Sequence, residues 1–321
     1  MAFENFKIRK FKDSDYSEIV RLEEKVYPDM KTSEKSYRFR DKNRAEKCKH
    51  QRYIAQIDDK VIGHGFYTQW EGSYQPGKFF IYILIHPDYQ GIGYGLKFYQ
   101  RILEELKEYD PVKLVCSARE DKERAIRFIK DRDFKETMKM WEAELKVNEF
   151  DFDEYSGLQG KLSEEGIVLT SLAELEMNEN NKKKLYELNE DIMEDVPMPD
   201  EYTRTDYERF IKRTFDHPEF FPEGYIIATK DDDFIGLSRH WLKDEENALF
   251  TGLTGVRRGY RGKGIATAMK VEAIKTAKEN DIKKIKTMNE TGNEDILHIN
   301  KKMGFEIKPA WIDFEKQRDE N

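Results

Sequence analysis

The chain has 321 residues, of which 56 are Lys or Arg and 64 are Asp or Glu, so its formal net charge at pH 7 is −8. Charged residues make up 37% of the sequence, but the 20 Phe and 17 Tyr can build an apolar core, which argues against a disordered chain. The acidic balance disfavours nucleic acid as the main partner, because phosphate binding requires a basic surface. The length predicts two domains of ordinary size.

No segment of the sequence is long enough to cross a membrane. The longest apolar run covers residues 79–85, whereas a spanning helix needs about 20 such residues. Residues 1–5 have neither the basic flank nor the apolar stretch of a signal peptide. Cys48 and Cys116 are too few for a disulfide framework, and with the six histidines they form no zinc-ligand spacing. We therefore expect a cytoplasmic protein with free thiols, no bound metal and no membrane contact.

Landmark residues recur at a nearly constant offset, which indicates an internal repeat. The offset is 171 residues, or 170 in one case, for Gly65 and Gly236, Trp70 and Trp241, 89–93 and 260–264, Phe134 and Phe305, and Trp141 and Trp311. The chain is therefore predicted to contain two copies of one domain, residues 1–147 and 167–321. Residues 148–166 are mostly polar, include three glycines and are predicted to form the linker.

Hydrophobic periodicity predicts the same order of elements in each copy. In the first copy, strands at 6–11, 53–57, 61–70 and 79–85 precede a helix at 94–109, a strand at 112–117, a helix at 122–131 and a strand at 135–146. In the second, a strand at 167–170, helices at 172–195 and 205–215, and strands at 225–229, 234–242 and 248–256 come first. A helix at 265–278, a strand at 282–288, a helix at 294–302, a strand at 306–314 and a charged tail at 315–321 follow.

In each copy, an apolar strand leads into a glycine-dense turn that begins a helix. Glycines let the backbone approach a ligand closely, and the free amides of a helix N-terminus attract phosphate, so each turn predicts an anion site. The dinucleotide fingerprint fails because Leu96 and Thr267 replace its third glycine, and the P-loop pattern fails because Gly264 replaces its Ser or Thr. The pattern that fits is Gln/Arg-x-x-Gly-x-Gly/Ala, at residues 90–95 and 261–266.

With these two turns, the sequence resembles the GNAT superfamily of acyl-CoA-dependent N-acetyltransferases, in a tandem arrangement similar to that of mycothiol synthase. The resemblance covers both halves and is strongest over residues 79–134 and 248–305. A second family motif, N-x-x-[AM]-x-x-[LI]-Y-x-x-x-G-F, is partly matched by the residues that end at Phe134 and Phe305. The resemblance implies two α+β domains, each with a mixed, mostly antiparallel sheet flanked by helices. Its central parallel strands would splay apart to admit the arm of the coenzyme.

The resemblance also implies acetyl-CoA as the co-substrate, with its pyrophosphate bound by backbone amides of the turns. Backbone groups of Thr254 and Val256 would bond the pantetheine arm and polarise the thioester carbonyl, a form of oxyanion stabilisation. The other residues implied to bind the coenzyme are Gln90, Gly91, Gly93 and Gly95 in the first half and Arg261, Gly262, Lys263, Gly264, Ile265, Ala266 and Asn293 in the second.

Motif completeness favours the second half as the catalytic one. It keeps Arg261 for phosphate binding and has Asn300 where many family members carry a tyrosine that protonates the leaving thiolate. The first half has Ile129 at that position and Asp133 in place of the motif glycine. Asn300 can bond the coenzyme, although an amide cannot serve as an acid at neutral pH. The first half is therefore expected to be degenerate, either structural or coenzyme-binding without turnover.

Glu194 and Asp195 are the candidates for the base that takes the proton of an acceptor amine. The strand at 248–256 lacks the carboxylate that many family members carry there, and the acidic segment 190–200 follows the helix expected to line the acceptor pocket. The alternative is that this segment is a solvated helix end, as most charged runs are.

The predicted function is acetyl-CoA-dependent N-acetylation of the primary amine of a small, cationic acceptor by direct attack on the thioester. The alternative is a non-catalytic acyl-CoA-binding scaffold or sensor, which the missing tyrosines favour. On the preferred hypothesis, Gly264→Glu abolishes activity and Gly93→Glu is tolerated. The sequence is compatible with a monomer and with a homodimer.

Overall fold

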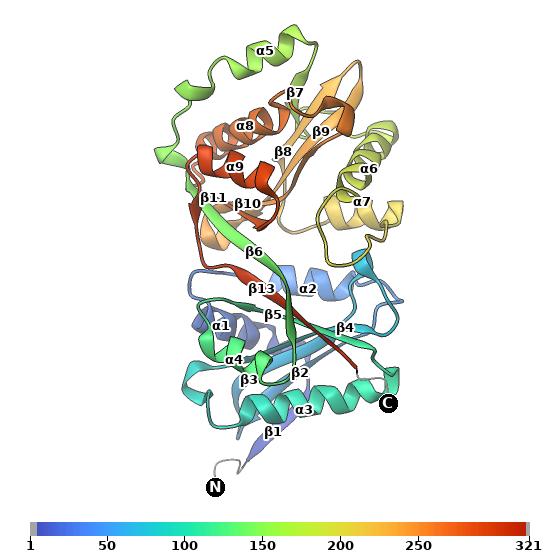
Figure 1. The fold of residues 1–321 in the computed structure, drawn as a ribbon, viewed down its shortest axis with the longest axis vertical. Helices are drawn as coiled ribbons and strands as arrows, with labels where there is room; N and C mark the ends of the chain where they lie inside the picture. The colour runs from blue at the N-terminus through green and yellow to red at the C-terminus, as the bar shows by residue number, and fades with distance from the viewer. Residues whose placement is uncertain (1–4, 319–321) are drawn as a thin grey trace. The chain divides into compact units, whose positions relative to one another are not determined.

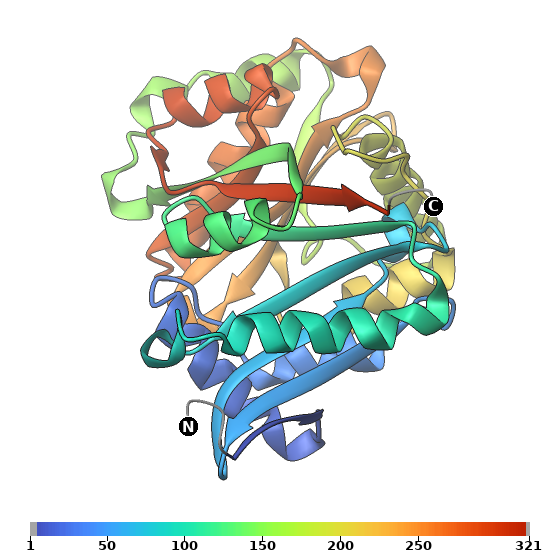
Figure 2. The same ribbon diagram turned by 60° about the horizontal axis from the view of Figure 1, so that its bottom comes forward.

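The structure, a computed structural model of the chain, describes residues 5–318. Residues 1–4, most of the segment used to exclude a signal peptide, and residues 319–321, the end of the expected tail, lie outside this range. The chain divides into two compact units, which Figures 1 and 2 show as ribbons. Unit 1 comprises Met1–Lys139 and Trp311–Asn321, and unit 2 comprises Met140–Ala310. Among the described residues, no helix combines the length and apolar composition that crossing a bilayer requires.

Unit 1 is a mixed sheet with helices on its faces. Its strands lie in the order β1-β2-β3-β4-β5-β13, and only the β4–β5 pair is parallel. The strands are β1 (Phe6–Lys10), β2 (His50–Ile57), β3 (Lys60–Thr68), β4 (Lys78–Ile85), β5 (Lys113–Arg119) and β13 (Trp311–Gln317). The helices are α1 (Tyr16–Val26), α2 (Glu34–Lys42), α3 (Tyr94–Leu106) and α4 (Glu123–Lys130).

Unit 2 repeats this plan. Its strands lie in the order β6-β11-β10-β9-β8-β7, with β12 also on β6, and only the β10–β11 pair is parallel. The strands are β6 (Lys135–Lys146), which belongs to unit 2 from Met140 onward, β7 (Val168–Ser171), β8 (Phe220–Lys230), β9 (Asp233–Lys243), β10 (Ala248–Val256), β11 (Lys284–Glu290) and β12 (Glu306–Ile307). The helices are α5 (Leu158–Glu164), α6 (Glu179–Met193), α7 (Tyr207–Phe215), α8 (Ile265–Glu279) and α9 (Glu294–Lys302).

The parallel strands of each unit diverge, which confirms the expected splay. In unit 1, β4 pairs with β5 only from Lys78 to Phe80, and both strands then continue without pairing to each other. In unit 2, β10 pairs with β11 only from Ala248 to Thr251. Each unit therefore has a gap in its backbone hydrogen bonding beside the end of the strand that leads into a glycine turn.

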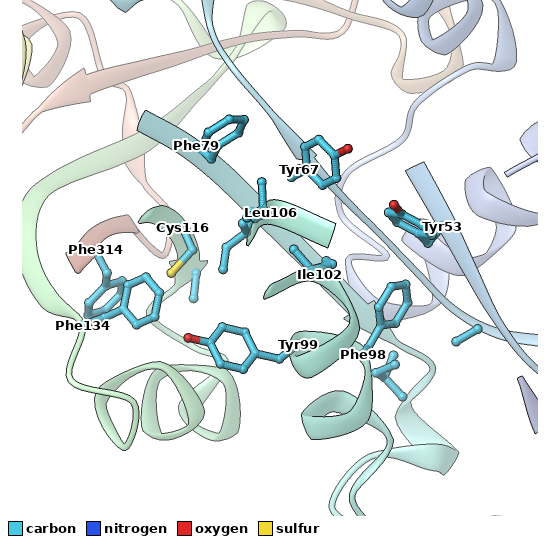
Figure 3. Packing of buried hydrophobic residues seen from close by; sticks show 14 of the residues in the cluster. Tyr53, Tyr67, Phe79, Phe98, Tyr99, Ile102, Leu106, Cys116, Phe134 and Phe314 are labelled. Atoms are coloured by element: carbon cyan, nitrogen blue, oxygen red, sulfur yellow. The ribbon is translucent and has the colours of Figure 1, made fainter. Parts of the chain in front are cut away.

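Helix α3 lies across one face of the unit 1 sheet (Figure 2) because one side of it is apolar. Tyr94, Phe98, Ile102 and Leu106 follow at four-residue spacing, which places them on one face of the helix, and all four are buried. Figure 3 shows Phe98, Ile102 and Leu106 packed among Tyr53, Tyr67 and Phe79 of the strands. This packing fixes the start of α3, and with it the first glycine turn, against the end of β4.

The last strands of the two sequence repeats are exchanged between the units. Strand β13, from the end of the second repeat, pairs with β5 from Trp311 opposite Arg119 onward (Figure 2). Its Phe314 is fully buried and lies beside Phe134 in the unit 1 core (Figure 3). Residues 140–146 of β6, from the first repeat, pair with β11 in unit 2. The compact units therefore differ from the ranges 1–147 and 167–321, which follow the sequence repeat.

Two details of the second repeat also differ from the sequence expectation. The expected strand at 306–314 is divided into β12 and β13. The expected tail at 315–321 is wrong for residues 315–317, which belong to β13 because they continue its pairing with β5. The expected linker contains α5, and its Leu162 is buried in the unit 2 core, so the segment is an ordered part of that unit.

Candidate functional site

The first glycine turn is closed by a side chain. Gln90 Nε2 donates a hydrogen bond of 2.8 Å to the carbonyl of Ile85, the last residue of β4. Gly91 and Gly93 have φ values of +84° and +101°, a region that favours glycine because a β-carbon would be strained there. Gly93 is the N-cap of α3, so the turn directs the free amides of that helix toward the end of β4.

A cavity of about 630 Å³ lies beside this turn, where β4 and β5 have diverged. This volume is within the range of about 300–1,000 Å³ that is usual for small-molecule sites. Its walls are Val26 and Tyr27 at the end of α1, Ile83, Leu84 and Ile85 of β4, Pro87 and Gln90 of the turn, and residues 121–125 and Arg127, which include the start of α4.

Two arginines of this cavity have free charges. A β-carbon on Gly91 would lie 3.3 Å from Arg124 Nη1, so this guanidinium stands directly over the turn. Arg124 and Arg127 both line the cavity, and neither has an ion-pair partner within residues 5–318. Free guanidiniums beside the N-terminus of a helix are suited to binding phosphate groups.

The second glycine turn has the same backbone plan. Arg261 Nε donates a hydrogen bond of 2.9 Å to the carbonyl of Val256, which corresponds to the Gln90–Ile85 bond. Gly262 and Gly264 have φ values of +78° and +82°. The structure therefore confirms that the two predicted turns are equivalent in shape.

The surroundings of the second turn differ, because its cations are paired with carboxylates. Arg258 and Arg261 both bind Asp195, and Lys263 binds Glu165 of the predicted linker segment. A β-carbon on Gly264 would lie 3.0 Å from Leu158 Cδ1, so the first residue of α5 covers this glycine. A phosphate group at this turn would have to compete with Asp195 and with the packing of Leu158.

Glu194 and Asp195, the predicted bases, are both held by arginines. Hydrogen bonds from Arg258 and Arg261, together with their charges, lower the pKa of Asp195 to about 2 although partial burial acts in the opposite direction. Glu194 Oε1 accepts a hydrogen bond of 2.9 Å from Arg204. Each carboxylate would have to leave its arginine partner before it could take a proton from an acceptor amine, so these ion pairs disfavour both residues as the base.

We expect Asp195→Asn to lower the free energy of unfolding at neutral pH and to have little effect near pH 2. The pKa of Asp195 is lower in the folded chain than its ordinary value of about 3.9. Its stabilising contribution is therefore complete above that value and is lost as the pH falls toward about 2. The pair is near the surface, so the effect at pH 7 is about 1 kcal/mol or less. Urea unfolding of wild type and variant checks this, and a difference that stays constant from pH 7 to pH 2.5 contradicts it.

Among the other predicted residues of the second half, Asn300 and Thr254 form hydrogen bonds within the protein. Asn300 is buried, and its Nδ2 donates to Asn289 Oδ1 at 2.8 Å while its Oδ1 has no hydrogen-bond partner. Thr254 Oγ1 lies 2.9 Å from Ser238 Oγ on β9. Asn293 is the N-cap residue of α9 and makes no side-chain cap bond. These residues lie at the ends of β10 and β11 and on α9, as expected.

Unit 1 contains a buried polar cluster that the sequence analysis missed. Glu23 of α1 lies 2.8 Å from His64 Nε2 of β3, and it accepts hydrogen bonds from Tyr82 of β4 at 2.9 Å and from Tyr37 of α2 at 3.0 Å. Burial raises the pKa of Glu23, but these hydrogen bonds outweigh it and the pKa is lowered overall. The cluster adjoins the cavity, because Tyr82 packs in one apolar group with Tyr27 and Leu84, which line the cavity.

No local signal in the sequence could have found this cluster. His64 and Tyr82 are 41 and 59 residues away from Glu23, and the four members come from four different elements. The same apolar group also includes Trp311 of β13, whose ring lies 5.3 Å from that of Tyr27. A residue from the end of the chain therefore stands beside the cavity of the first half.

Comparison with known proteins identifies the relatives of this fold. The model of the acetyltransferase (GNAT) family matches residues 16–134 and 183–305, while no curated protein matches the chain. A GCN5-related N-acetyltransferase from Sphaerobacter thermophilus is 16% identical, with a TM-score of 0.72 over 98% of this chain and 96% of its own. A tandem GNAT protein from the clavulanic acid biosynthesis pathway is 14% identical, with a TM-score of 0.76 over 98% and 99%. A GCN5-related N-acetyltransferase from Kribbella flavida is 10% identical, with a TM-score of 0.51 over 97% and 72%.

Proposed function

Because the chain belongs to the acetyltransferase (GNAT) family, with one family match in each half, we propose that it acetylates the primary amine of a small, cationic acceptor and that its first half holds acetyl-CoA. The observation that carries the second part is the cavity at the splay of β4 and β5, with Arg124 over the adjoining turn. The pyrophosphate would lie on residues 90–95. The pantetheine arm would enter between the two strands.

The contrast in charge between the two turns supports the first half. Arg124 and Arg127 are free to neutralise phosphate, whereas Asp195 already neutralises Arg258 and Arg261 at the second turn. The sequence analysis favoured the second half because its motifs are more complete. The contacts of the folded chain favour the reverse assignment, in which unit 2 lacks turnover and unit 1 carries the reaction.

We assign proton transfer in this reaction to the Glu23 cluster. The nitrogen of the acceptor amine attacks the carbonyl carbon of the thioester, the carbon–sulfur bond breaks, and the thiol of the coenzyme leaves after taking up a proton. The attacking amine must lose a proton, and the Glu23 carboxylate, which bonds to Tyr82 and His64 and pairs with no Arg or Lys within residues 5–318, is a buried anion next to the residues of the cavity wall. The same negative charge, beside the rings of Tyr27 and Trp311, favours a cationic acceptor.

The second candidate function is an acyl-CoA-binding scaffold or sensor without turnover. It is favoured by Ile129, which stands on α4 where many family members carry the tyrosine acid and can donate no proton. The two functions differ in one observable, the release of free coenzyme A when amines are supplied.

A thiol-detection assay with acetyl-CoA and a panel of amines tests the proposal. We expect turnover with at least one cationic amine, a loss of about 100-fold or more in kcat/KM for Gly93→Glu, and near wild-type turnover for Gly264→Glu. The new carboxylate at residue 93 would repel the pyrophosphate and fill its place on the turn. The two glycines have similar left-handed φ values, so the backbone strain of the variants is matched.

Each other outcome of this assay has a definite meaning. Loss of turnover in folded Gly264→Glu alone would place the reaction in the second half and overturn the assignment. If no amine of the panel releases coenzyme A from the wild type, the chain is the scaffold or sensor.

A further inference from the structure

A group of hydrogen-bond donors without acceptors lies in unit 2, on strands that the proposed reaction does not use. Arg239 of β9 is flanked in the sheet by Tyr225 of β8 and Leu253 of β10. Its Nη1 donates a bond of 3.1 Å to Asn189 of α6, while its Nε is buried without a partner. Figure 1 shows α6 and α7 beside β9 in this unit.

Arg239 has no carboxylate partner of its own. Within residues 5–318 it forms no ion pair, and burial lowers the pKa of its guanidinium. Glu190, whose charge acts on Arg239, accepts hydrogen bonds from Tyr202, Asn189 and the amide of Thr205. Glu190 thus reaches Arg239 only through Asn189, and the Nε–Nη2 edge of the guanidinium stays free. This edge is the one that forms two parallel bonds with a carboxylate.

Two further donors come from residues next to Arg239. The hydroxyl of Tyr225 is buried and has no hydrogen-bond partner. A β-carbon on Gly252 would lie 2.6 Å from Trp241 Nε1 and 3.3 Å from Arg239 Nε, so both nitrogens stand beside this glycine. Gly252 is exposed and lies at the point where the register between β10 and β9 shifts. The missing side chain lets β10 approach both donors closely, because a β-carbon at residue 252 would press on them.

We propose that these donors form a binding site for a small carboxylate ligand in unit 2, with Arg239 making a bidentate pair and Trp241 donating a further bond. A guanidinium in the interior without an anion is costly, and a bound carboxylate would offset that cost. The planar free edge can form two parallel hydrogen bonds with the two oxygens of a carboxylate. This site is separate from the coenzyme site proposed in unit 1 and does not depend on it.

The test uses the full-length chain, with sodium succinate as the probe and ionic strength held constant with sodium chloride. We expect succinate to raise the unfolding midpoint of the wild type in a saturable way. Arg239→Lys keeps the positive charge but loses the two parallel N–H donors of the guanidinium, so it should weaken the apparent affinity for succinate by about 10- to 100-fold. Gly252→Ala keeps Arg239 and puts a β-carbon beside both donors, so it should weaken binding as well. Arg258→Gln, an exposed arginine of the same unit, is the control and should bind as the wild type does.

The outcomes separate this site from its alternatives. The proposal is overturned if Arg239→Lys and Gly252→Ala respond to succinate as strongly as the wild type does. It is also overturned if the wild type shows no saturable response. A saturable response to inorganic phosphate that exceeds the response to succinate would show a phosphate site and overturn the carboxylate assignment. Gly93→Glu should keep the full succinate response even if it has lost acetyl-CoA turnover, so the two proposals can fail independently.

Discussion

Glu23→Gln is expected to lower kcat by about 100-fold or more, because it removes the buried negative charge that accepts the proton of the amine. The substitution keeps the size of the side chain, and an amide oxygen in the place of Oε1 can still accept from Tyr82 and Tyr37. The KM for acetyl-CoA should change little, since Glu23 is not among the residues that line the coenzyme cavity. Steady-state kinetics in the thiol-release assay measures both quantities.

The matched control for this variant is Glu18→Gln, on the same helix. Glu18 is half-buried, and within residues 5–318 its ion pair is with Arg21 one turn later, so its loss should leave kcat within about twofold of the wild type. A merely structural role of Glu23 predicts a different pattern, in which the unfolding midpoint falls and the kcat of the folded fraction is retained. That pattern would contradict the proposed proton transfer.

Phe314→Ala is expected to lower the free energy of unfolding by about 3–5 kcal/mol, as is usual for removing a fully buried phenylalanine. Phe314 is near the end of the chain, yet it packs with Phe134 and Cys116 in the unit 1 core (Figure 3). The control is Trp70→Ala, where the ring is 48% exposed and the loss should be much smaller. Denaturant unfolding measures both changes.

The strands that lose hydrogen-exchange protection in Phe314→Ala show whether β13 belongs to the unit 1 sheet. Hydrogen exchange of Phe314→Ala should lose protection in β4 and β5, because β13 pairs with β5. A conventional arrangement, in which the last strand stays within its own sequence repeat, predicts the loss in β10 and β11 instead. Greater loss in β10 and β11 than in β4 and β5 would therefore contradict the observed pairing.

The sequence predicted the repeated elements because local patterns determine them. The turns at 90–95 and 261–266 need glycine at positions with positive φ, and the apolar spacing of α3 follows from its contact with the sheet. The exchange of β6 and β13 could not be predicted in the same way. In both units the exchanged strand pairs antiparallel with the strand that follows the glycine-turn helix, β13 with β5 and β6 with β11, and the pattern within a strand does not say which of these partners it takes.

The choice between the two halves depends on contacts that a motif does not contain. Arg261 matches the family pattern, but its charge is neutralised by Asp195, which is 66 residues away in the sequence. Gly264 also matches, but Leu158 of the expected linker packs against it. The first half departs from the pattern at Ile129 and Asp133 and still has the free arginines and the cavity. A sequence motif shows only which residues are present. Ligand binding also requires that other side chains do not cover the site or neutralise its charges.

The most direct test of the central claim is calorimetric titration of acetyl-CoA into the wild type, Gly93→Glu and Gly264→Glu. We predict one site per chain in the wild type, no detectable binding to Gly93→Glu and unchanged binding to Gly264→Glu. Circular dichroism confirms that each variant is folded before its titration is interpreted. Binding that survives in Gly93→Glu and disappears in Gly264→Glu would contradict the account and place the coenzyme in the second half.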